Sequence, residues 1–201
     1  FTHEIIPVNI PQRKGDPIVI DTDAHPRAST TLEGLAKLKP VVTAEGTVTA
    51  GNASGINDGA AAVLIASEQA IQQYQLKPRA KIIASTAVGV EPRIMGFAPA
   101  PAIKKLLKQA NLTIEQMDVI ELNEAFAAQA LAVTRDLGLA DDTTQVNPNG
   151  GAIAIGHPLG ASGARLVTTA LNQLEQTGGT YALCSMCIGV GQGIAMIIQR
   201  V

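Results

Sequence analysis

From Pro78 to the end of the chain, short apolar runs alternate with segments whose apolar residues recur every three or four positions. The short runs predict strands, and the periodic segments predict amphipathic helices. Strands are predicted at 80–90, 117–122, 144–147, 181–187 and 194–201, and helices at 101–111, 124–137 and 162–176. Elements that alternate at this spacing favour an α/β fold in which helices cover a sheet based on parallel strands.

The first part of the chain follows a different pattern. Its prolines predict extended segments and turns around one short helix, which Thr30 and Glu33 begin as a capping box. After a glycine-rich loop, the continuous apolar run 60–66 predicts a strand buried on both faces. Ser67 is then expected to cap a helix that continues to about Tyr74. The change of pattern places a domain boundary near Pro78.

The composition excludes several classes of partner. Hydrophobic residues make up 46% of the 201 residues, charged residues make up 16%, and the net charge is −2. These values fit neither a disordered acidic chain nor a polycation, and the 2% of aromatic residues disfavour base stacking, so no nucleic acid is expected as a partner. The longest apolar stretches, 59–66 and 188–198, are far below the ~20 residues that cross a bilayer, so no membrane is expected either.

The N-terminus and the cysteines bear on the cellular compartment. The segment that begins at Phe1 has neither the basic region nor the hydrophobic region of a secretory signal. It also has no initiator methionine, so we expect a processed or truncated product. A disulfide between the two cysteines would close too short a loop to stabilise a fold of this size. A reducing compartment is therefore favoured. The bacterial cytoplasm is the expected location, and an organellar matrix is the alternative.

A histidine lies in the most unusual segment of the sequence, a glycine-rich loop from Asn147 to Arg165. Glycine lets the backbone approach a ligand closely, and the loop ends at a predicted helix N-terminus, so His157 should be held rigidly near backbone N–H groups. This arrangement suits proton transfer, although a histidine that merely caps a turn is the alternative. The glycines match neither a dinucleotide-binding fingerprint nor a P-loop.

The two cysteines, Cys184 and Cys187, are spaced as C-x-x-C. A redox pair needs the first cysteine at a helix N-terminus, and a zinc site needs about four ligands, so both interpretations are weak and no metal is expected. A small buried residue is the plain interpretation of Cys184. For Cys187 a functional role is favoured, because the glycine-rich turn after it exposes N–H groups that can stabilise an oxyanion.

Two further segments combine polar residues with a predicted strand end or loop. Asn123 and Glu124 lie at the carboxyl end of a strand, where open α/β sheets place their active sites. The plain alternative is that Asn123 caps the next helix and Glu124 suits the dipole of that helix. The loop from Ala50 to Gly59 surrounds Ser54 with small residues. It is either a solvated turn or a channel for a long thin ligand.

Together these segments resemble the thiolase family in order and approximate spacing. The resemblance rests on Asn-Glu-Ala-Phe at 123–126, Gly-His-Pro at 156–158, Cys-Ile-Gly at 187–189, and the run 51–59, which is similar to the coenzyme A loop of the family. Only the C-terminal half of a thiolase is matched, and the nucleophilic cysteine of the family's first half has no counterpart here.

The resemblance implies a fold and a division into domains. Thiolases pack two similar halves into an αβαβα layered fold, and the expected part here is the second half, a mixed β-sheet with helices on both faces. Residues 1–56 then resemble the end of the loop (insertion) domain, 57–77 the return segment of the N-terminal domain, and 78–201 the C-terminal domain. Without the first half, the apolar helix face that packs against it is expected to be exposed.

The resemblance also implies a reaction, the thiolytic cleavage of a 3-oxoacyl-CoA or the reverse Claisen condensation. By analogy with the family, Cys187 is the acid and base, and His157 activates the nucleophile and donates to a thioester oxygen. Asn123 positions a water as the companion donor, and the N–H of Gly189 contributes to a second oxyanion hole. Such chemistry needs an acid for the enolate carbon and fixed donors for its oxygen.

Four positions match residues that line the coenzyme A path in the family: Ser54, Arg27, Met95 and Phe126. Coenzyme A is therefore expected as a substrate, with no tightly bound cofactor. The stretches 93–101 and 187–193 look more like degradative thiolases, among them the 3-oxoadipyl-CoA type, than the biosynthetic kind. The expected partners are acyl-CoA, the N-terminal thiolase half, and further copies in a dimer or tetramer.

Two other functions stay open at this point. A ketoacyl synthase shares the fold and the condensation chemistry, but the cysteine in Cys187-Ile188-Gly189 disfavours it. A non-catalytic module that binds acyl-CoA or serves assembly fits the missing nucleophile. Because the nucleophile of the thiolase family has no counterpart here, we expect this chain to be inactive alone.

Overall fold

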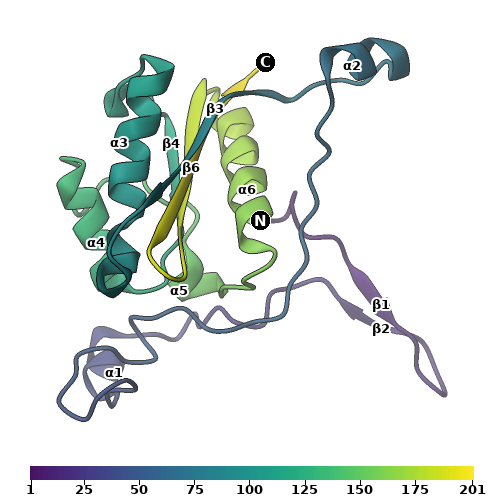
Figure 1. The fold of residues 1–201 in the computed structure, drawn as a ribbon. Coiled ribbons are helices and arrows are strands. Elements are labelled where there is room, and N and C mark those ends of the chain that lie inside the picture. The colour runs from purple at the N-terminus through teal and green to yellow at the C-terminus, as the bar shows by residue number, and fades with distance from the viewer.

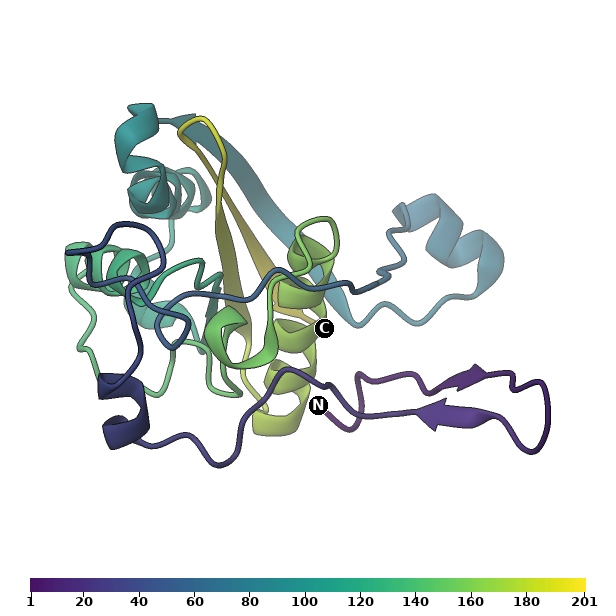
Figure 2. The ribbon, with the colours of Figure 1, turned by 90° about the horizontal axis from the view of Figure 1, so that it is seen from below.

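A computed structural model describes residues 1–201 and shows two parts (Figure 1). The first part, residues 1–79, is an extended arm in which no residue is buried. The second part, residues 80–201, is a four-stranded sheet with helices on both faces. Seen from below, the arm runs past one end of the sheet, and its first hairpin and its last helix project away from the body (Figure 2).

The sheet has the strand order β3-β6-β5-β4. Its strands are β3 (Ala80–Gly89), β4 (Val119–Leu122), β5 (Tyr181–Ile188) and β6 (Gln192–Arg200). Only β4 and β5 are parallel, whereas β6 is antiparallel to both of its neighbours. The expected mixed sheet is present, but the prediction that it is based on parallel strands is wrong. A turn as short as 189–191 between β5 and β6 permits only a hairpin, because a parallel pair needs a long crossover.

One predicted strand of this part is absent. Residues 144–147 form only an isolated parallel bridge between Val146 and Ile120, because the chain leaves β4 again at Asn147. The side chain of Asn147 takes over the pairing there, accepting a hydrogen bond from the N–H of Leu122 at 2.8 Å and donating to its carbonyl at 2.9 Å.

The helices of the second part are α3 (Pro99–Ala110), α4 (Ala127–Asp136), α5 (Ala152–Ile155) and α6 (Ser162–Thr177), with 3₁₀ turns η1 (Pro92–Phe97) and η2 (Ile114–Gln116). Helix α3 begins two residues before the predicted Pro101, because Pro99 supplies the first helical position. It ends as predicted at Asn111, in the left-handed conformation. None of the helices combines the length and the apolar character that a membrane crossing requires.

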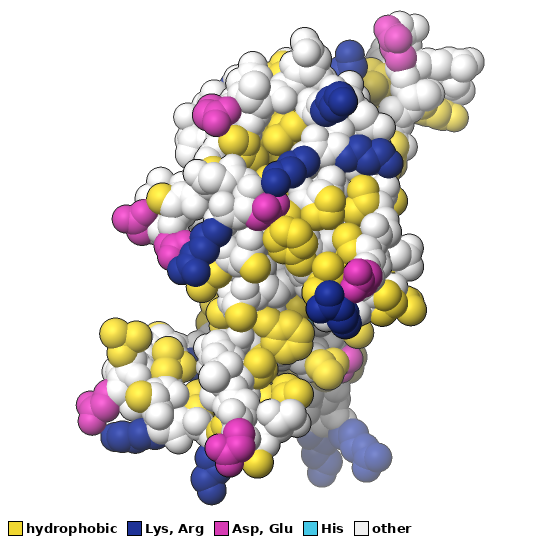
Figure 3. All heavy atoms as spheres, turned by 60° about the vertical axis from the view of Figure 1, so that its left-hand side comes forward, with side chains coloured by type: hydrophobic (Ala, Val, Ile, Leu, Met, Phe, Trp, Pro, Cys, Tyr) yellow, Lys and Arg dark blue, Asp and Glu magenta, His cyan; other side chains and the backbone are white.

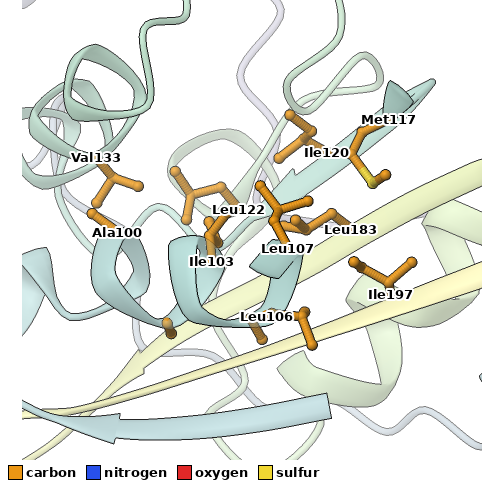
Figure 4. Packing of buried hydrophobic residues seen from close by; sticks show 12 residues of the cluster. Ala100, Ile103, Leu106, Leu107, Met117, Ile120, Leu122, Val133, Leu183 and Ile197 are labelled. Carbon is orange, nitrogen blue, oxygen red and sulfur yellow. The ribbon is translucent and has the colours of Figure 1, made fainter. Parts of the chain in front are cut away.

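The sheet separates two apolar clusters. On one face, α3 packs Ile103 and Leu106 against Leu183 and Ile197 of the strands, with α4 beside it (Figure 4). On the other face, the stripe of α6 predicted from the sequence contacts Val119, Ala182, Cys184 and Ile198 through Leu166, Ala170 and Leu174. Successive strand residues point to opposite faces, which explains why neighbours such as Leu183 and Cys184 belong to different clusters.

The arm contains β1 (Val8–Ile10) and β2 (Ile18–Ile20), which pair in an antiparallel hairpin, and the helices α1 (Leu32–Ala36) and α2 (Glu68–Tyr74). Ser67 caps α2 as predicted, accepting a hydrogen bond from the N–H of Ala70. The predicted capping box of α1 is wrong, because Thr31 is the N-cap and Thr30 instead donates to the carbonyl of Arg27.

The run 60–66 is neither a strand nor buried. Leu64 and Ile65 are 83% and 72% exposed, so the prediction of a strand buried on both faces is wrong for this chain. Burial of an apolar run depends on what packs against it, and in this run only Ala66 is even partly buried. Apolar side chains also gather over the middle of the face shown in Figure 3. Leu131 of α4, Phe126 at the N-cap of that helix and Ile94 of η1 are each partly exposed.

Candidate active site

The site is centred on Asn123, which follows β4 directly and is fully buried. Its backbone N–H donates to the carbonyl of Ser185 on β5 at 3.0 Å, so it continues the parallel pairing by one residue. Its side-chain Nδ2 lies 3.3 Å from Nε2 of His157, and its Oδ1 has no hydrogen-bond partner. Asn123 does not cap α4, because the N-cap of that helix is Phe126.

His157 is held by a loop from the arm. Its backbone N–H lies 3.1 Å from the carbonyl of Gly55 and 3.2 Å from Oδ1 of Asn57. The preceding Gly156 has a φ of +94°, and a Cβ there would lie 2.4 Å from Oδ1 of Asn57, so only glycine fits. The arm thus fixes the backbone on which the histidine is carried.

The other ring nitrogen of His157 contacts Ser162, the first residue of α6. Nδ1 lies 2.6 Å from the hydroxyl Oγ, and this hydroxyl donates to the carbonyl of Pro158 at 3.0 Å. The sequence predicts Ser162 only as the start of a helix, and its contact with His157 is not predicted. The signal available in the sequence is its spacing of five residues from the histidine, across a turn that Pro158 begins.

The cysteine predicted to act, Cys187, lies near the end of β5, two residues after the carbonyl that receives the N–H of Asn123. Asn123 therefore links the loop of His157 with the end of β5. After Cys187 the chain turns, and the N–H of Gly189 makes no backbone hydrogen bond within the chain. The space beside Gly189 is open, since a Cβ there would meet nothing within 4 Å.

Burial keeps the side chains of His157 and Cys187 neutral near pH 7. It lowers the pKa of His157, and the positive charge of Arg165 lowers it further. Burial raises the pKa of the Cys187 thiol, which a hydrogen bond to its own backbone only partly offsets. The site thus offers a free imidazole that can accept a proton and a thiol that can supply one.

Cys184 lies on the opposite face of β5, among the residues that pack against α6. Burial raises the pKa of its thiol far above the ordinary range, and the nearby carboxylate of Glu121 adds to this effect. Glu121 is itself fully buried and accepts a 2.8 Å hydrogen bond from Arg165. Cys184 is a core residue, as the plain interpretation predicts.

Glu124, predicted to suit the dipole of the helix after it, serves a different helix. Its Oε2 accepts from the N–H of Ile153 at 3.2 Å, at the start of α5, and its Oε1 accepts from Nδ2 of Asn147 at 2.6 Å. The carboxylate also fills the space beside Gly151, where a Cβ would lie 2.2 Å from it. Glu124 therefore fastens the start of the glycine-rich loop to the end of β4.

Three of the four residues assigned to the coenzyme A path lie around the start of α4. The N–H of Ser54 donates to the carbonyl of Ala125 at 3.0 Å, next to the half-exposed Phe126. Met95 lies in η1, which packs against α4. Arg27 is exposed on the arm and takes part in none of the ion pairs of the chain.

No three or more His, Cys, Asp or Glu side chains are grouped so that they could hold a metal ion. The groups at the site that can take part in proton transfer or donate hydrogen bonds are Asn123, His157, Cys187 and the N–H of Gly189. Their arrangement provides a base, an acid and hydrogen-bond donors at one end of the sheet, which is where α/β sheets place their active sites.

Comparison with known proteins gives matches over the whole chain. Residues 76–200 match the family model described as thiolase, C-terminal domain, and residues 1–69 match thiolase, N-terminal domain. The chain is 86% identical over its full length to a beta-ketoadipyl-CoA thiolase of Acinetobacter baylyi and covers 50% of that protein. It is 60% identical over its full length to the 3-oxoadipyl-CoA/3-oxo-5,6-dehydrosuberyl-CoA thiolase of Escherichia coli, again covering 50%.

Solved structures agree with this result. The acetyl-CoA acetyltransferase of Bacillus anthracis superposes with a TM-score of 0.92 at 43% identity, over 98% of this chain and 49% of its own. Human mitochondrial 3-ketoacyl-CoA thiolase in complex with CoA superposes with a TM-score of 0.84 at 47% identity, over 92% and 46%. The chain spans about half the length of the curated relatives it matches. On its sequence and its fold, this chain belongs to the thiolase family.

Proposed function

We propose that this chain supplies the acid–base half of a thiolase active site, for the cleavage of a 3-oxoacyl-CoA by CoA or the reverse condensation. The observation that carries the proposal is the contact between Asn123 and His157, made beside the end of the strand that carries Cys187. The matched family and the names of the relatives supply the reaction class.

The cleavage step assigns a proton to Cys187. When a thiolate attacks the 3-oxo carbon, the bond between C2 and C3 of the substrate breaks and its electron pair forms the enolate of acetyl-CoA. The neutral thiol of Cys187 gives its proton to C2 of this enolate and becomes a thiolate. The open N–H of Gly189 stabilises the negative charge on an oxygen, for which a fixed donor typically contributes about 3 kcal/mol. The CoA thiol that then takes up the acyl group gives its proton to the thiolate of Cys187, which restores the neutral thiol. In condensation the same groups act in reverse.

His157 serves the acyl-transfer step. As a neutral imidazole it accepts the proton of the attacking thiol at Nε2, and it then donates that proton as a hydrogen bond to the thioester oxygen. Asn123 stands beside it, with its unpartnered Oδ1 free to accept from a water that acts as the second donor. Cys184 does not suit the role of nucleophile, because it is buried on the other face of the sheet. We assign the nucleophile to the half of the relatives that this chain does not match.

Coenzyme A is assigned to the space around Ser54, Met95 and Phe126, with Arg27 at the nucleotide end. The division into 1–56, 57–77 and 78–201 belongs to the same proposal, as do a dimer or tetramer and a bacterial cytoplasmic location. The names of the two relatives cited above favour 3-oxoadipyl-CoA, a dicarboxylic acyl-CoA, as the substrate.

The test is a hybrid protein in which this chain replaces the matched half of the Acinetobacter relative. We expect it to cleave 3-oxoadipyl-CoA with CoA. Changing Cys187→Ala should lower kcat by about 10² to 10⁴-fold, the usual contribution of a positioned acid or base. Cys184→Ala is the matched control and should retain most of the activity. Full activity of the Cys187→Ala hybrid would contradict the assigned role.

A second experiment distinguishes the alternative functions. Calorimetry with CoA and a thiolysis assay are carried out on the 201-residue chain alone. We expect no turnover by this chain. Turnover without a partner would contradict the assignment of the nucleophile to the other half, and tight CoA binding combined with an inactive hybrid would favour the non-catalytic module.

A further inference from the structure

The geometry points to Ser162 as a positioning residue that keeps the proton of neutral His157 on Nδ1 and leaves Nε2 unprotonated, as a base requires. This inference rests on the proposed function for its catalytic consequence, but the proton position can be tested without activity. It begins with the hydrogen-bond chain that runs from Asn123 through the imidazole to the hydroxyl of Ser162 and on to the carbonyl of Pro158.

A serine hydroxyl has a single proton to donate. Here Oγ of Ser162 lies 3.0 Å from the carbonyl of Pro158, in the bond that serine commonly makes to the residue four positions earlier. With its proton directed there, the hydroxyl oxygen meets Nδ1 of His157 at 2.6 Å as an acceptor. The ring must therefore donate at Nδ1, and a neutral ring that donates at Nδ1 carries a lone pair at Nε2.

The environment of Asn123 supports the same assignment. Its Nδ2 donates to the lone pair on Nε2, and its Oδ1 is the buried atom left without a partner. In the other tautomer Nε2 carries the proton, so the side-chain amide of Asn123 must turn over to accept it, and its buried N–H group is left without a partner. The hydroxyl of Ser162 must then donate to Nδ1 and loses its hydrogen bond to the carbonyl of Pro158. Buried carbonyl oxygens without a partner are tolerated more often than buried N–H groups, so the first network is favoured.

The nature of the partner matters for the chemistry. A hydroxyl accepts from Nδ1–H both before and after Nε2 takes up a proton, so the ring keeps its orientation throughout the reaction. Because Ser162 is uncharged, it orients the ring without the strong increase in basicity that a carboxylate partner gives an imidazole. The ring can thus accept a proton from a thiol and release it again in the same catalytic cycle.

The test reads the proton position directly. The 201-residue chain is labelled with ¹⁵N in its histidine rings, and the signals of His157 are assigned by their loss in His157→Gln. We expect Nδ1 to be protonated and Nε2 to be unprotonated at pH 8. Ser162→Ala should move the population toward protonation at Nε2, and Ser162→Thr should restore the original state. Ser162→Cys keeps the size of the side chain with a poorer acceptor and should behave like Ser162→Ala.

The matched control is Thr168→Ala on the same helix. Thr168 makes the same kind of bond to the carbonyl of Ala164, at 3.0 Å, without contacting a histidine. It should leave the tautomer of His157 unchanged. Protonation of Nε2 in the unmodified chain, or an unchanged tautomer in both Ser162→Ala and Ser162→Cys, would overturn the inference.

Activity of the hybrid protein separates this inference from the proposed function. If the competent tautomer falls to a tenth of the population, kcat falls about tenfold while KM stays within about twofold. Ser162→Thr should recover kcat, and Thr168→Ala should leave it unchanged. An inactive unmodified hybrid with the expected tautomer contradicts the proposed function alone, whereas an active hybrid with the other tautomer contradicts the positioning role alone.

Discussion

The buried carboxyl of Glu121 should make the stability of this chain depend on pH in an unusual direction. The side chain is fully buried between β4 and α6, and burial raises its pKa from 4.5 to about 7, even though Arg165 attracts its charged form. The folded chain then binds a proton more tightly than the unfolded chain. The resulting stabilisation is complete below pH 4.5 and is lost as the pH rises through about 7.

The size of the effect follows from the shift. One pKa unit corresponds to about 1.4 kcal/mol, so the whole shift corresponds to about 3 kcal/mol. Between pH 8.5 and pH 5.5, about 2 kcal/mol of this should be gained. Glutamine has nearly the shape of a protonated glutamate and does not titrate. Glu121→Gln should therefore remove this part of the pH dependence while keeping a hydrogen-bond partner for Arg165.

The assay is urea unfolding of the unmodified chain and of Glu121→Gln between pH 5.5 and 8.5. The difference in their free energies of unfolding cancels the titration of all other groups, including His157. We expect this difference to change by about 2 kcal/mol in favour of the unmodified chain as the pH falls. Glu175→Gln, which removes the carboxylate of an exposed ion pair with Arg79, should show no such trend. A difference that stays constant with pH would refute the reasoning.

Three further predictions concern packing and the loops. Leu166→Ala removes a buried side chain from the cluster under α6 and should lower the free energy of unfolding by about 3 kcal/mol, measured by urea unfolding. In the same assay Leu64→Ala, at an exposed position, should change the free energy of unfolding by less than about 0.5 kcal/mol. Gly156→Ala should destabilise the chain by about 1 to 3 kcal/mol because of its positive φ, whereas Gly189→Ala should not, as thermal unfolding will show. Cys184 should react with a maleimide only as fast as the chain unfolds, as mass spectrometry will show.

The elements that follow from local rules are predicted well by the sequence. The amphipathic stripe of α6, the left-handed end of α3 at Asn111 and the cap of α2 at Ser67 depend on residues within a few positions of one another. The periodicity of the apolar residues is enough to find them. The same holds for β3, whose predicted and observed positions differ by one residue.

The features that the sequence does not predict depend on distant parts of the chain. The run 60–66 has the composition of a buried strand, but only a neighbouring surface determines whether it is buried. Glu124 follows a strand and precedes α4, yet its carboxylate turns to α5 because the glycine-rich loop returns beside it. The contact of Ser162 with His157 is not predicted, because it depends on how the turn after His157 closes. The antiparallel pairing of β5 and β6 is likewise determined by the length of the turn between them, which periodicity does not measure.

The bond between the N–H of His157 and the side chain of Asn57 has a consequence for folding kinetics. The two residues are 100 positions apart. Strands β3 and β6 are farther apart still, but they pair over most of their length, whereas the arm that carries Asn57 buries none of its residues. Closing so long a loop carries a large entropic cost before any contact compensates for it. The loop of His157 should therefore acquire its final shape late in refolding, after the strands have paired, so that recovery of the histidine environment lags behind recovery of secondary structure.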